Sequence, residues 1–466
     1  MSNKIRNPKD MKTLNQTIFR EYDIRGKYPE DLNPSSIRSI AFSIAKKCKA
    51  ESIDSLVIGR DGRLSGPELT KILEAELNKN GISTQNIGVV TSPLLYFAAK
   101  KSSTLSGIML TGSHNPKNYN GIKMVINDQP ISGKEIYEGI SSKPSSFNQN
   151  QAVRKNLNVV QTYVNEIVNS FSSIHKKIVV DCGNGAAGEI APYLFKKIGC
   201  EVIELFCEID GNFPNHHPDP GKKENLQDLI MTVKKTNADL GIAFDGDGDR
   251  LGVVTTKGKI IYPDQLMMIF AEDILKKNKK GTIIFDVKCS DHLPKIIEAN
   301  HGSPIMSPTG HFHIKKKIKE HNALLGGEMS GHIFFNDTWY GFDDGLYSAI
   351  RLLDILNRQN MDLDKMAAKL PKSFATEELN IDVKEEEKFM IIEKFIKEQS
   401  LSKIFNTLDG IRLSFDNGWA LLRASNTTPK LVLRFEANSQ NQLETIQKDF
   451  LGELKKIIPS LNINLK

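Results

Sequence analysis

The sequence predicts three related α/β domains followed by a smaller C-terminal α+β domain. The chain has 466 residues, which is too long for a single hydrophobic core. A strand–loop–helix–strand pattern occurs three times at a spacing of roughly one hundred residues, and such a repeat indicates α/β domains of related build. After about residue 370 the pattern changes to neighbouring strands bounded by charged helical stretches.

Each repeat reads as an apolar strand, a loop, a helix and a second strand. The predicted elements are strand 56–59, helix 67–79 and strand 84–90, then strand 178–181, a helix ending near 198 and strand 201–205, and finally strand 282–287, helix 291–300 and strand 303–305.

The remaining segments mark the boundaries and the last domain. Residues 1–14 read as a loose tail, and the polar stretch 141–150 reads as a linker. A further boundary is expected near 370–373. The last domain is predicted to contain strand 378–383, helix 385–398, strands 411–415 and 419–423, and helix 442–457.

Composition narrows the class of protein. Hydrophobic residues make up 39% and charged residues 25%, as in soluble globular proteins. The net charge of +6 is too small to predict a nucleic-acid binder. The polar start predicts no signal peptide, and no apolar run predicts a membrane span. The five cysteines lack a Cys-x-x-Cys pair, which argues against disulfides and structural zinc. We expect a cytoplasmic protein.

The stretch Thr111-Gly112-Ser113-His114-Asn115-Pro116 follows the apolar strand 106–110. A serine between Gly and His at the end of a strand is expected to present its hydroxyl, with Gly112 leaving room for a partner. The alternative is a turn in which Ser113 caps a helix. Three distant loops offer what a phosphorylated serine would need.

The first of these loops is Asp245-Gly246-Asp247-Gly248-Asp249-Arg250, after the apolar strand 240–244. Three carboxylates separated by single glycines repel one another unless a cation lies between them, and hard oxygen ligands suit Mg²⁺. An EF-hand is excluded because Arg250 and Thr256 occupy its sixth and twelfth positions. Arg250 could donate two hydrogen bonds to a phosphate on the metal.

Two weaker loops complete the set. In Gly326-Gly327-Glu328-Met329-Ser330-Gly331-His332, Glu328 and Ser330 lie two residues apart. In extended chain they point the same way and could bind adjacent sugar hydroxyls, although a Gly-rich turn is an equal alternative. The stretch 423–429, Arg-Ala-Ser-Asn-Thr-Thr-Pro, gathers an arginine, hydroxyls and backbone N–H groups that suit a phosphate, unless it is an ordinary hairpin loop.

Two other motifs favour different readings. Gly183-Asn184-Gly185-Ala186-Ala187-Gly188 matches a dinucleotide-binding fingerprint and supports a rival hypothesis, an NAD-type oxidoreductase with Glu204 or Glu208 on the ribose. That hypothesis leaves the three aspartates unexplained. The lysine-rich run 313–319 reads as the solvated face of an amphipathic helix.

Together the four loops resemble those of the α-D-phosphohexomutase superfamily, most closely its bacterial phosphomannomutase/phosphoglucomutase branch. The matching motifs are TGSHNP, DGDGDR, GEMSGH and RASNTTP, in that order. The resemblance implies a cytoplasmic isomerase of carbohydrate metabolism, a heart-shaped monomer or homodimer whose four domains each give one loop to a central cleft. The domains would comprise residues 1–155 (phosphoserine loop), 156–258 (metal-binding loop), 259–370 (sugar-binding loop) and 371–466 (phosphate-binding loop).

The resemblance also implies the roles of individual residues. Ser113 would be the phosphoserine, and Mg²⁺ would be held by Asp245, Asp247, Asp249 and a phosphoserine oxygen. Catalysis would further involve Arg25, Lys123, Arg250 and His332, with Lys123 and His332 as candidates for the general base. The phosphosugar would contact the residues Tyr22, Lys288, His311, Glu328, Ser330, Arg423, Ser425, Asn426 and Thr427.

The implied reaction interconverts hexose 1-phosphate and hexose 6-phosphate through a hexose 1,6-bisphosphate. Glu328-Met329-Ser330 resembles the mannose/glucose type, whereas the glucosamine branch usually has Gln at the middle position; phosphoglucosamine mutase is the alternative. One residue departs from the pattern, because Pro308 stands where the family often has a lysine before Thr309-Gly310-His311. If that lysine helps to bind phosphate in relatives, then either Lys288 or the run Lys315–Lys317 replaces it, or substrate binding is weaker. A mutase-like binding module is a third hypothesis, but it would require a broken loop.

Overall fold

The computed structural model describes residues 14–141, 152–425 and 428–463. The chain divides into two compact units, one of residues 1–260 and 342–363 and the other of residues 261–341 and 364–466. The tail predicted before residue 14 and nearly all of the linker predicted at 141–150 lie outside the described residues.

The first unit begins with a mixed sheet and its helices. Its elements are η2 (Gln16–Ile18), β1 (Ile24–Lys27), α1 (Pro34–Ala50), β2 (Ser55–Arg60), α2 (Gly66–Lys79), β3 (Ser83–Val89), α3 (Ser92–Lys101), β4 (Gly107–Leu110), β5 (Tyr119–Ile126), β6 (Gln129–Pro130), α4 (Gly133–Ser141) and β7 (Arg154–Asn156). The strand order is β1-β5-β4-β2-β3-β7, with β6 paired to β5. Apolar residues at helical spacing, such as Ile37, Ile40 and Ile44 of α1, are buried in its core.

The same unit contains a second, five-stranded sheet. Its elements are α5 (Val160–Ser170), β8 (Lys177–Asp181), α6 (Ala187–Ile198), β9 (Glu201–Leu205), η3 (Lys223–Leu226), α7 (Gln227–Thr236), β10 (Leu240–Phe244), β11 (Leu251–Thr255), β12 (Ile260–Ile261) and, much later in the chain, α11 (Gly345–Arg358). The strand order is β12-β11-β10-β8-β9. Helix α11 belongs to this unit and packs on β11.

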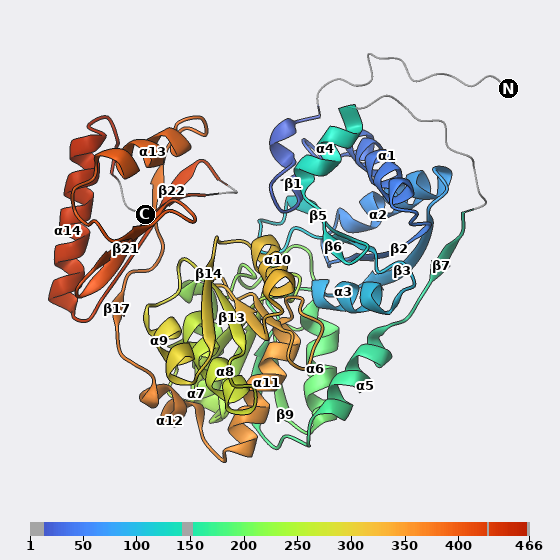
Figure 1. Ribbon diagram of the computed structural model, residues 1–466. Helices are drawn as coiled ribbons and strands as arrows, with labels where there is room; N and C mark the ends of the chain where they lie inside the picture. Colours follow the sequence, from blue (N-terminus) through green and yellow to red (C-terminus); the bar gives the residue numbers. More distant parts are fainter. Residues whose placement is uncertain (1–13, 142–151, 426–427, 464–466) are drawn as a thin grey trace. The chain divides into compact units, whose positions relative to one another are not determined.

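The second unit contains the third repeat and the C-terminal domain. Its elements are α8 (Pro263–Lys277), β13 (Thr282–Asp286), α9 (His292–Ala299), β14 (Ser303–Ser307), α10 (His311–His321), β15 (Leu325–Gly327), β16 (Ile333–Phe335), α12 (Leu363–Lys369), β17 (Phe374–Ala375), β18 (Leu379–Asp382), α13 (Lys388–Glu398), β19 (Phe405–Asn406), β20 (Ile411–Phe415), β21 (Gly418–Ala424), β22 (Lys430–Ala437) and α14 (Gln440–Ile457). The sheets run β14-β13-β15-β16 and β17-β22-β21-β20-β19, with β18 paired to β22. Helices α13 and α14 cover the latter sheet, and their Phe395 and Phe450 rings lie 4.9 Å apart (Figure 1).

The three repeats share one topology. In β2–β5, β8–β11 and β13–β16 the first strand pairs in parallel with the second and the third, and the fourth pairs antiparallel with the third. The connection from third to fourth strand is short, so it makes a reversal rather than a parallel crossover. The predicted fold of three related α/β domains with mixed sheets and a C-terminal α+β domain is confirmed.

Three details bear on the expectations from sequence. All five cysteines are free thiols. Within the described part of the chain, no helix combines the length and the hydrophobicity needed to cross a membrane. The lysine run lies on α10, but Lys315 is buried with its Nζ 6.0 Å from the centroid of the Phe334 ring, so the expectation of a solvated face is wrong for that residue.

Tyr163 connects α5 to the start of α11 and provides a test of this packing. Its fully buried hydroxyl donates to Asp344, with distances of 3.0 and 2.9 Å to the two carboxylate oxygens. Asp344 in turn caps α11 by accepting from the backbone N–H of Tyr347. We expect Tyr163→Phe to lower the free energy of unfolding by about 1.5–3 kcal/mol, because a buried carboxylate loses a donor.

Urea unfolding of the variant and the wild type would measure this loss. The control is Tyr193→Phe, which alters a tyrosine that is 37% exposed on α6 and should change the free energy of unfolding by at most about 0.5 kcal/mol. Equal effects of the two substitutions would contradict the role of the Tyr163–Asp344 contact.

Candidate active site

The predicted loops occupy one topological position. The Ser113 loop joins β4 to β5, the Asp245–Arg250 loop joins β10 to β11, and the Glu328 loop joins β15 to β16. Each therefore links the third strand of a repeat to its antiparallel fourth strand. The Arg423–Pro429 stretch joins β21 to β22 in the C-terminal domain. Chain repetition thus explains why chemistry-bearing residues recur at the carboxyl ends of strands.

Ser113 is held in a tight loop within the first unit. The residue has φ +47° and its backbone N–H donates to Thr111 Oγ1 at 2.8 Å. Its hydroxyl donates to Asp245 Oδ2 at 2.7 Å and lies 3.1 Å from His114 Nδ1. Only 2% of Ser113 is exposed, so the expected presentation of the hydroxyl is toward Asp245 rather than solvent. The chain continues into β5, so the alternative of a helix cap is wrong.

The three aspartates after β10 are buried together. Asp245, Asp247 and Asp249 each offer an oxygen, and these atoms all lie within 4.8 Å of one another. Burial, and then the negative charges of Asp247 and Asp249, raise the pKa of Asp245 well above its ordinary value. Burial also opposes ionisation of Asp247, but the Lys123 ammonium outweighs it and lowers the pKa of Asp247.

Lys123 is the cationic partner of this cluster. Its Nζ lies 2.7 Å from Asp247 Oδ2 and 2.5 Å from Asp249 Oδ2, and the residue is 3% exposed. Burial alone would lower the pKa of Lys123, yet the Asp247 and Asp249 carboxylates raise it well above the usual value. In this arrangement, with no metal ion between the aspartates, Lys123 is an ammonium paired with two carboxylates.

The cluster fits a metal ion. Three buried carboxylates compete for one ammonium group, and Asp247 Oδ1 is buried without a hydrogen-bond partner among the residues that the structure describes. Buried acceptors in this condition are costly unless a cation or donor reaches them. The acidic cluster could therefore hold a metal with oxygen ligands.

Arg25, Arg250 and Tyr22 lie in the same unit. Arg25 belongs to β1 and is buried; it donates to Asp23 Oδ2 and to Asn115 Oδ1, each at 2.5 Å. It thereby contacts the Ser113 loop. Arg250 is half-buried, with Nη1 3.8 Å from Asp219 Oδ1. Tyr22 is half-buried in the bend before β1.

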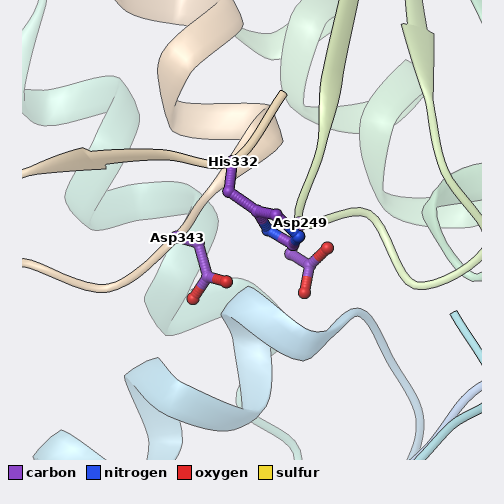
Figure 2. Close-up of side chains that lie close together, drawn as sticks. All are labelled: Asp249, His332 and Asp343. Carbon is purple, nitrogen blue, oxygen red and sulfur yellow. The ribbon is translucent and has the colours of Figure 1, made fainter. Parts of the chain in front are cut away.

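Asp343, to which sequence analysis gave no role, adds a buried carboxylate beside Asp249. It lies just before α11, and an oxygen of Asp343 is within 4.8 Å of one of Asp249 (Figure 2). The negative charge of Asp343 also contributes to the raised pKa of Lys123. His332, which Figure 2 also labels, belongs to the second unit.

In the second unit, residues of the loop between β15 and β16 lie close to His311. Glu328 is 2% exposed; its Oε1 accepts from the Gly310 N–H and its Oε2 from the Ser330 hydroxyl at 3.3 Å. Burial raises the pKa of Glu328 above the ordinary glutamate value, although the charge of His332 opposes the shift. The rings of His311 and His332 have centroids 5.6 Å apart. The predicted set Glu328, Ser330, His311 and His332 is thus one local group.

The cationic residues of this unit are held by acidic partners. Lys288 Nζ lies 2.6 Å from Glu378 Oε1, and Arg423 Nε lies 2.9 Å from Asp409 Oδ2. Burial would raise the pKa of Glu378, but Lys288 lowers it to about 2. Ser425 is buried and its hydroxyl accepts from the Thr428 N–H at 3.1 Å. Asn426 and Thr427 lie outside the described residues.

Sequence reasoning missed a set of buried aspartates. Asp61, Asp181 and Asp286 follow or end the first strand of each repeat and bind loop backbone. Asp61 Oδ2 accepts from the Gly112 N–H at 3.1 Å, Asp181 Oδ1 from Gly183 at 2.9 Å, and Asp286 Oδ1 from Met329 at 3.2 Å. Alignment of the three repeats would have revealed an aspartate at the same point in each.

The glycine-rich fingerprint serves packing. The Ala186 N–H donates to the Gly246 carbonyl at 2.9 Å, and a Cβ added at Gly185 would lie 2.9 Å from that carbonyl oxygen. The acidic loop therefore occupies the space that the oxidoreductase hypothesis assigns to a pyrophosphate.

Comparison with known proteins agrees with this geometry. Four successive stretches match the domains described as phosphoglucomutase/phosphomannomutase α/β/α domain I (residues 16–146), II (161–258) and III (262–374) and the C-terminal domain (378–453). The phosphomannomutase/phosphoglucomutase of Pseudomonas syringae pv. tomato is 49% identical over 97% of each chain. The phosphoglucomutase of Neisseria gonorrhoeae is 45% identical, over 94% of this chain and 97% of its own.

The solved structure of a phosphoglucomutase/phosphomannomutase family protein from Burkholderia thailandensis is similar throughout. It is 44% identical, covers 97% of this chain and 99% of its own, and superposes with a TM-score of 0.91. The full-length matches and the order of the four loops lead to one conclusion: this chain belongs to the phosphoglucomutase/phosphomannomutase family of the α-D-phosphohexomutase superfamily, whose members are hexose phosphate mutases, a class of isomerase.

Proposed function

We propose that the protein interconverts the 1-phosphate and 6-phosphate of mannose and glucose through a phosphorylated Ser113. The observation that carries the proposal is the 2.7 Å hydrogen bond from the Ser113 hydroxyl to Asp245, the first of three clustered aspartates. A phosphoryl group on that oxygen would lie beside a cation site. Relatives of similar length are named for these two sugars.

Asp245, Asp247, Asp249 and the phosphorylated Ser113 would hold Mg²⁺, because hard oxygen ligands of this kind suit it. When bound, the ion would draw electron density from the phosphoryl oxygens. Lys123, already an ammonium, neutralises charge beside it, and Arg250 does so from the end of the same loop. Arg25 supports the loop through Asn115.

In the proposed reaction the free hydroxyl of a hexose monophosphate attacks the phosphorus on Ser113. The bond from Ser113 Oγ to phosphorus breaks, a bond from the sugar oxygen to phosphorus forms, and the hydroxyl proton passes to a base. Of the two candidates, Lys123 and His332, we assign the base to His332, because Lys123 Nζ is already bound by the Asp247 and Asp249 carboxylates. The resulting hexose 1,6-bisphosphate turns over and returns its other phosphoryl group to Ser113.

The phosphosugar would be bound by residues of the second unit together with Tyr22. Glu328 and Ser330 would take adjacent sugar hydroxyls, an assignment supported by their shared hydrogen bond. The non-reacting phosphate would be bound by a cationic and polar set, namely His311, Lys288, Arg423, Ser425, Asn426 and Thr427. We retain the division into residues 1–155, 156–258, 259–370 and 371–466, with one loop from each.

A coupled assay tests the substrate assignment. Mannose 1-phosphate, glucose 1-phosphate and glucosamine 1-phosphate are compared with Mg²⁺ and a trace of hexose 1,6-bisphosphate. Comparable turnover of the first two, with little of the third, is the expected result. A preference for the glucosamine sugar would favour the alternative, phosphoglucosamine mutase, and absence of all turnover would contradict the proposal.

We expect Ser113→Ala to reduce turnover at least about 10³-fold, because the phosphoryl carrier is lost. The matched control is Ser102→Ala, which removes a half-buried hydroxyl at the end of α3 and should leave turnover unchanged. Intact-mass spectrometry after incubation with hexose 1,6-bisphosphate should show one phosphoryl group on the wild type and the control but none on Ser113→Ala. Undiminished turnover of Ser113→Ala would refute the phosphoserine.

Metal removal provides a second test. Treatment with EDTA should abolish turnover, and added Mg²⁺ should restore it. Mg²⁺ at about 100 times its Kd should also stabilise the folded wild type by about 2.7 kcal/mol, visible as a higher unfolding temperature. Asp247→Asn should lose this stabilisation, whereas Glu201→Gln, whose side chain is 69% exposed at the start of β9, should retain it. An equal Mg²⁺ response in both variants would argue against the Asp247 ligand.

The raised pKa of Glu328 predicts an acid limb in activity. Glu328 must be ionised to accept hydrogen bonds from sugar hydroxyls, and burial raises its pKa, so kcat/KM should fall as pH decreases through a value above the ordinary glutamate pKa of about 4.3. The profile of Glu328→Gln, lower throughout, should lack this limb, while titration of the substrate phosphate remains in both. An identical acid limb in the variant would show that another group titrates.

A further inference from the structure

A single buried arginine, Arg63, binds the backbone of the Ser113 loop. Arg63 has no exposed surface. Its Nη1 donates to the carbonyls of Pro116 and Tyr119 at 2.7 and 2.9 Å. Its Nη2 donates to the carbonyls of Ser113 and Asn115 at 2.7 and 2.6 Å. One guanidinium therefore binds four backbone carbonyl groups of the same loop.

Asp61 completes the arrangement from the other side. Its Oδ2 accepts from Arg63 Nε at 3.1 Å and from the Thr111 hydroxyl at 2.8 Å, as well as from the Gly112 N–H. Asp61 therefore holds the start of the loop, and Arg63 holds its middle and end. A Cβ at Gly112 would collide with the Arg63 guanidinium, so the glycine of the motif is required by this arginine.

We propose that Arg63 is a positioning residue for phosphoryl transfer at Ser113, an inference that rests on the proposed function. The left-handed φ of +47° at Ser113 is unfavourable for a residue with a side chain. Arg63 offsets that cost by binding the Ser113 carbonyl, which leaves Oγ directed at Asp245. Arg63 does not contact the reacting atoms; it acts on the position of Ser113 through the loop backbone.

The guanidinium is needed because its planar fork reaches several acceptors at once. A lysine ammonium at this position would keep a positive charge beside Asp61 but could not span four carbonyls. The third repeat shows the contrast: Lys288 stands two residues after Asp286, as Arg63 stands after Asp61, and its ammonium binds Glu378 instead of a loop backbone.

The test compares Arg63→Lys with Arg60→Lys; Arg60 is the last residue of β2, and its Nη1 donates to the Asp61 carbonyl at 3.1 Å. Arg63→Lys should lower kcat about 10²-fold, because small displacements of a reacting group cost that much, with KM within about threefold of wild type. Hydrogen exchange of peptides covering residues 111–119 should become faster. Arg60→Lys should change neither.

Three results would overturn the proposal: unchanged exchange in the loop, faster exchange with unchanged kcat, or a KM that rises by the same factor as kcat falls. Should Arg63→Lys fail to fold, Gly112→Ala displaces the guanidinium from the loop side and should show the same loss of kcat and faster exchange. The Ser113→Ala control separates the two proposals. If Ser113→Ala still turned over substrate, the phosphoserine itself would be refuted. If Ser113→Ala were inactive while Arg63→Lys had the wild-type kcat, only the positioning role of Arg63 would be refuted.

Discussion

The first unit depends on the compensation of buried negative charge. Asp245, Asp247 and Asp249 have no exposed surface, and an ionised carboxylate without partners is costly in such a place. The Lys123 ammonium comes from β5, and the Ser92 hydroxyl, 2.6 Å from Asp247 Oδ2, comes from the start of α3. Strand β5 belongs to the first sheet and α3 packs on that sheet, whereas the aspartates follow β10 of the second sheet. The need to pair these charges therefore joins the two sheets at the place where Ser113 meets Asp245.

A repeated backbone plan gives each loop its support. A short third-to-fourth strand connection reverses the chain at the carboxyl end of a parallel pair, and a buried aspartate after the first strand binds backbone N–H groups there. Asp61 and Asp286 do this for the loops of Ser113 and Glu328, and Asp181 does it for the turn beneath Gly246. The same backbone plan can then carry different side chains on its loops: Ser113 in the first repeat, three clustered aspartates in the second, and Glu328 with Ser330 in the third.

The bounds of a helix or strand could be predicted from the sequence where the pattern lies within the segment itself. Strands β9, β10 and β20 have the predicted bounds, and α2, α6 and α14 deviate by two residues or fewer, because apolar spacing and glycine breaks are local. The loops were found because their residue types are unusual within a few positions. What could not be predicted depends on distant partners: the burial of Arg25, the pairing of Lys123 with Asp247, the packing of α11 with the first unit, and the role of Arg63.

The glycine fingerprint at residues 183–188 also depends on distant partners, so its local pattern is misleading. Gly185 lies against the Gly246 carbonyl, and a Cβ at Gly246 would collide with the Ser113 carbonyl. Three backbone segments are therefore stacked, from the start of α6 through the acidic loop to the Ser113 loop, with a glycine at each contact. Gly112 continues the series because Arg63 needs its missing side chain. In a dinucleotide-binding protein the equivalent glycines make room for a ligand. Here they make room for the protein's own chain, so that the hydroxyl of Ser113 and the carboxylate of Asp245 come within one hydrogen bond of each other.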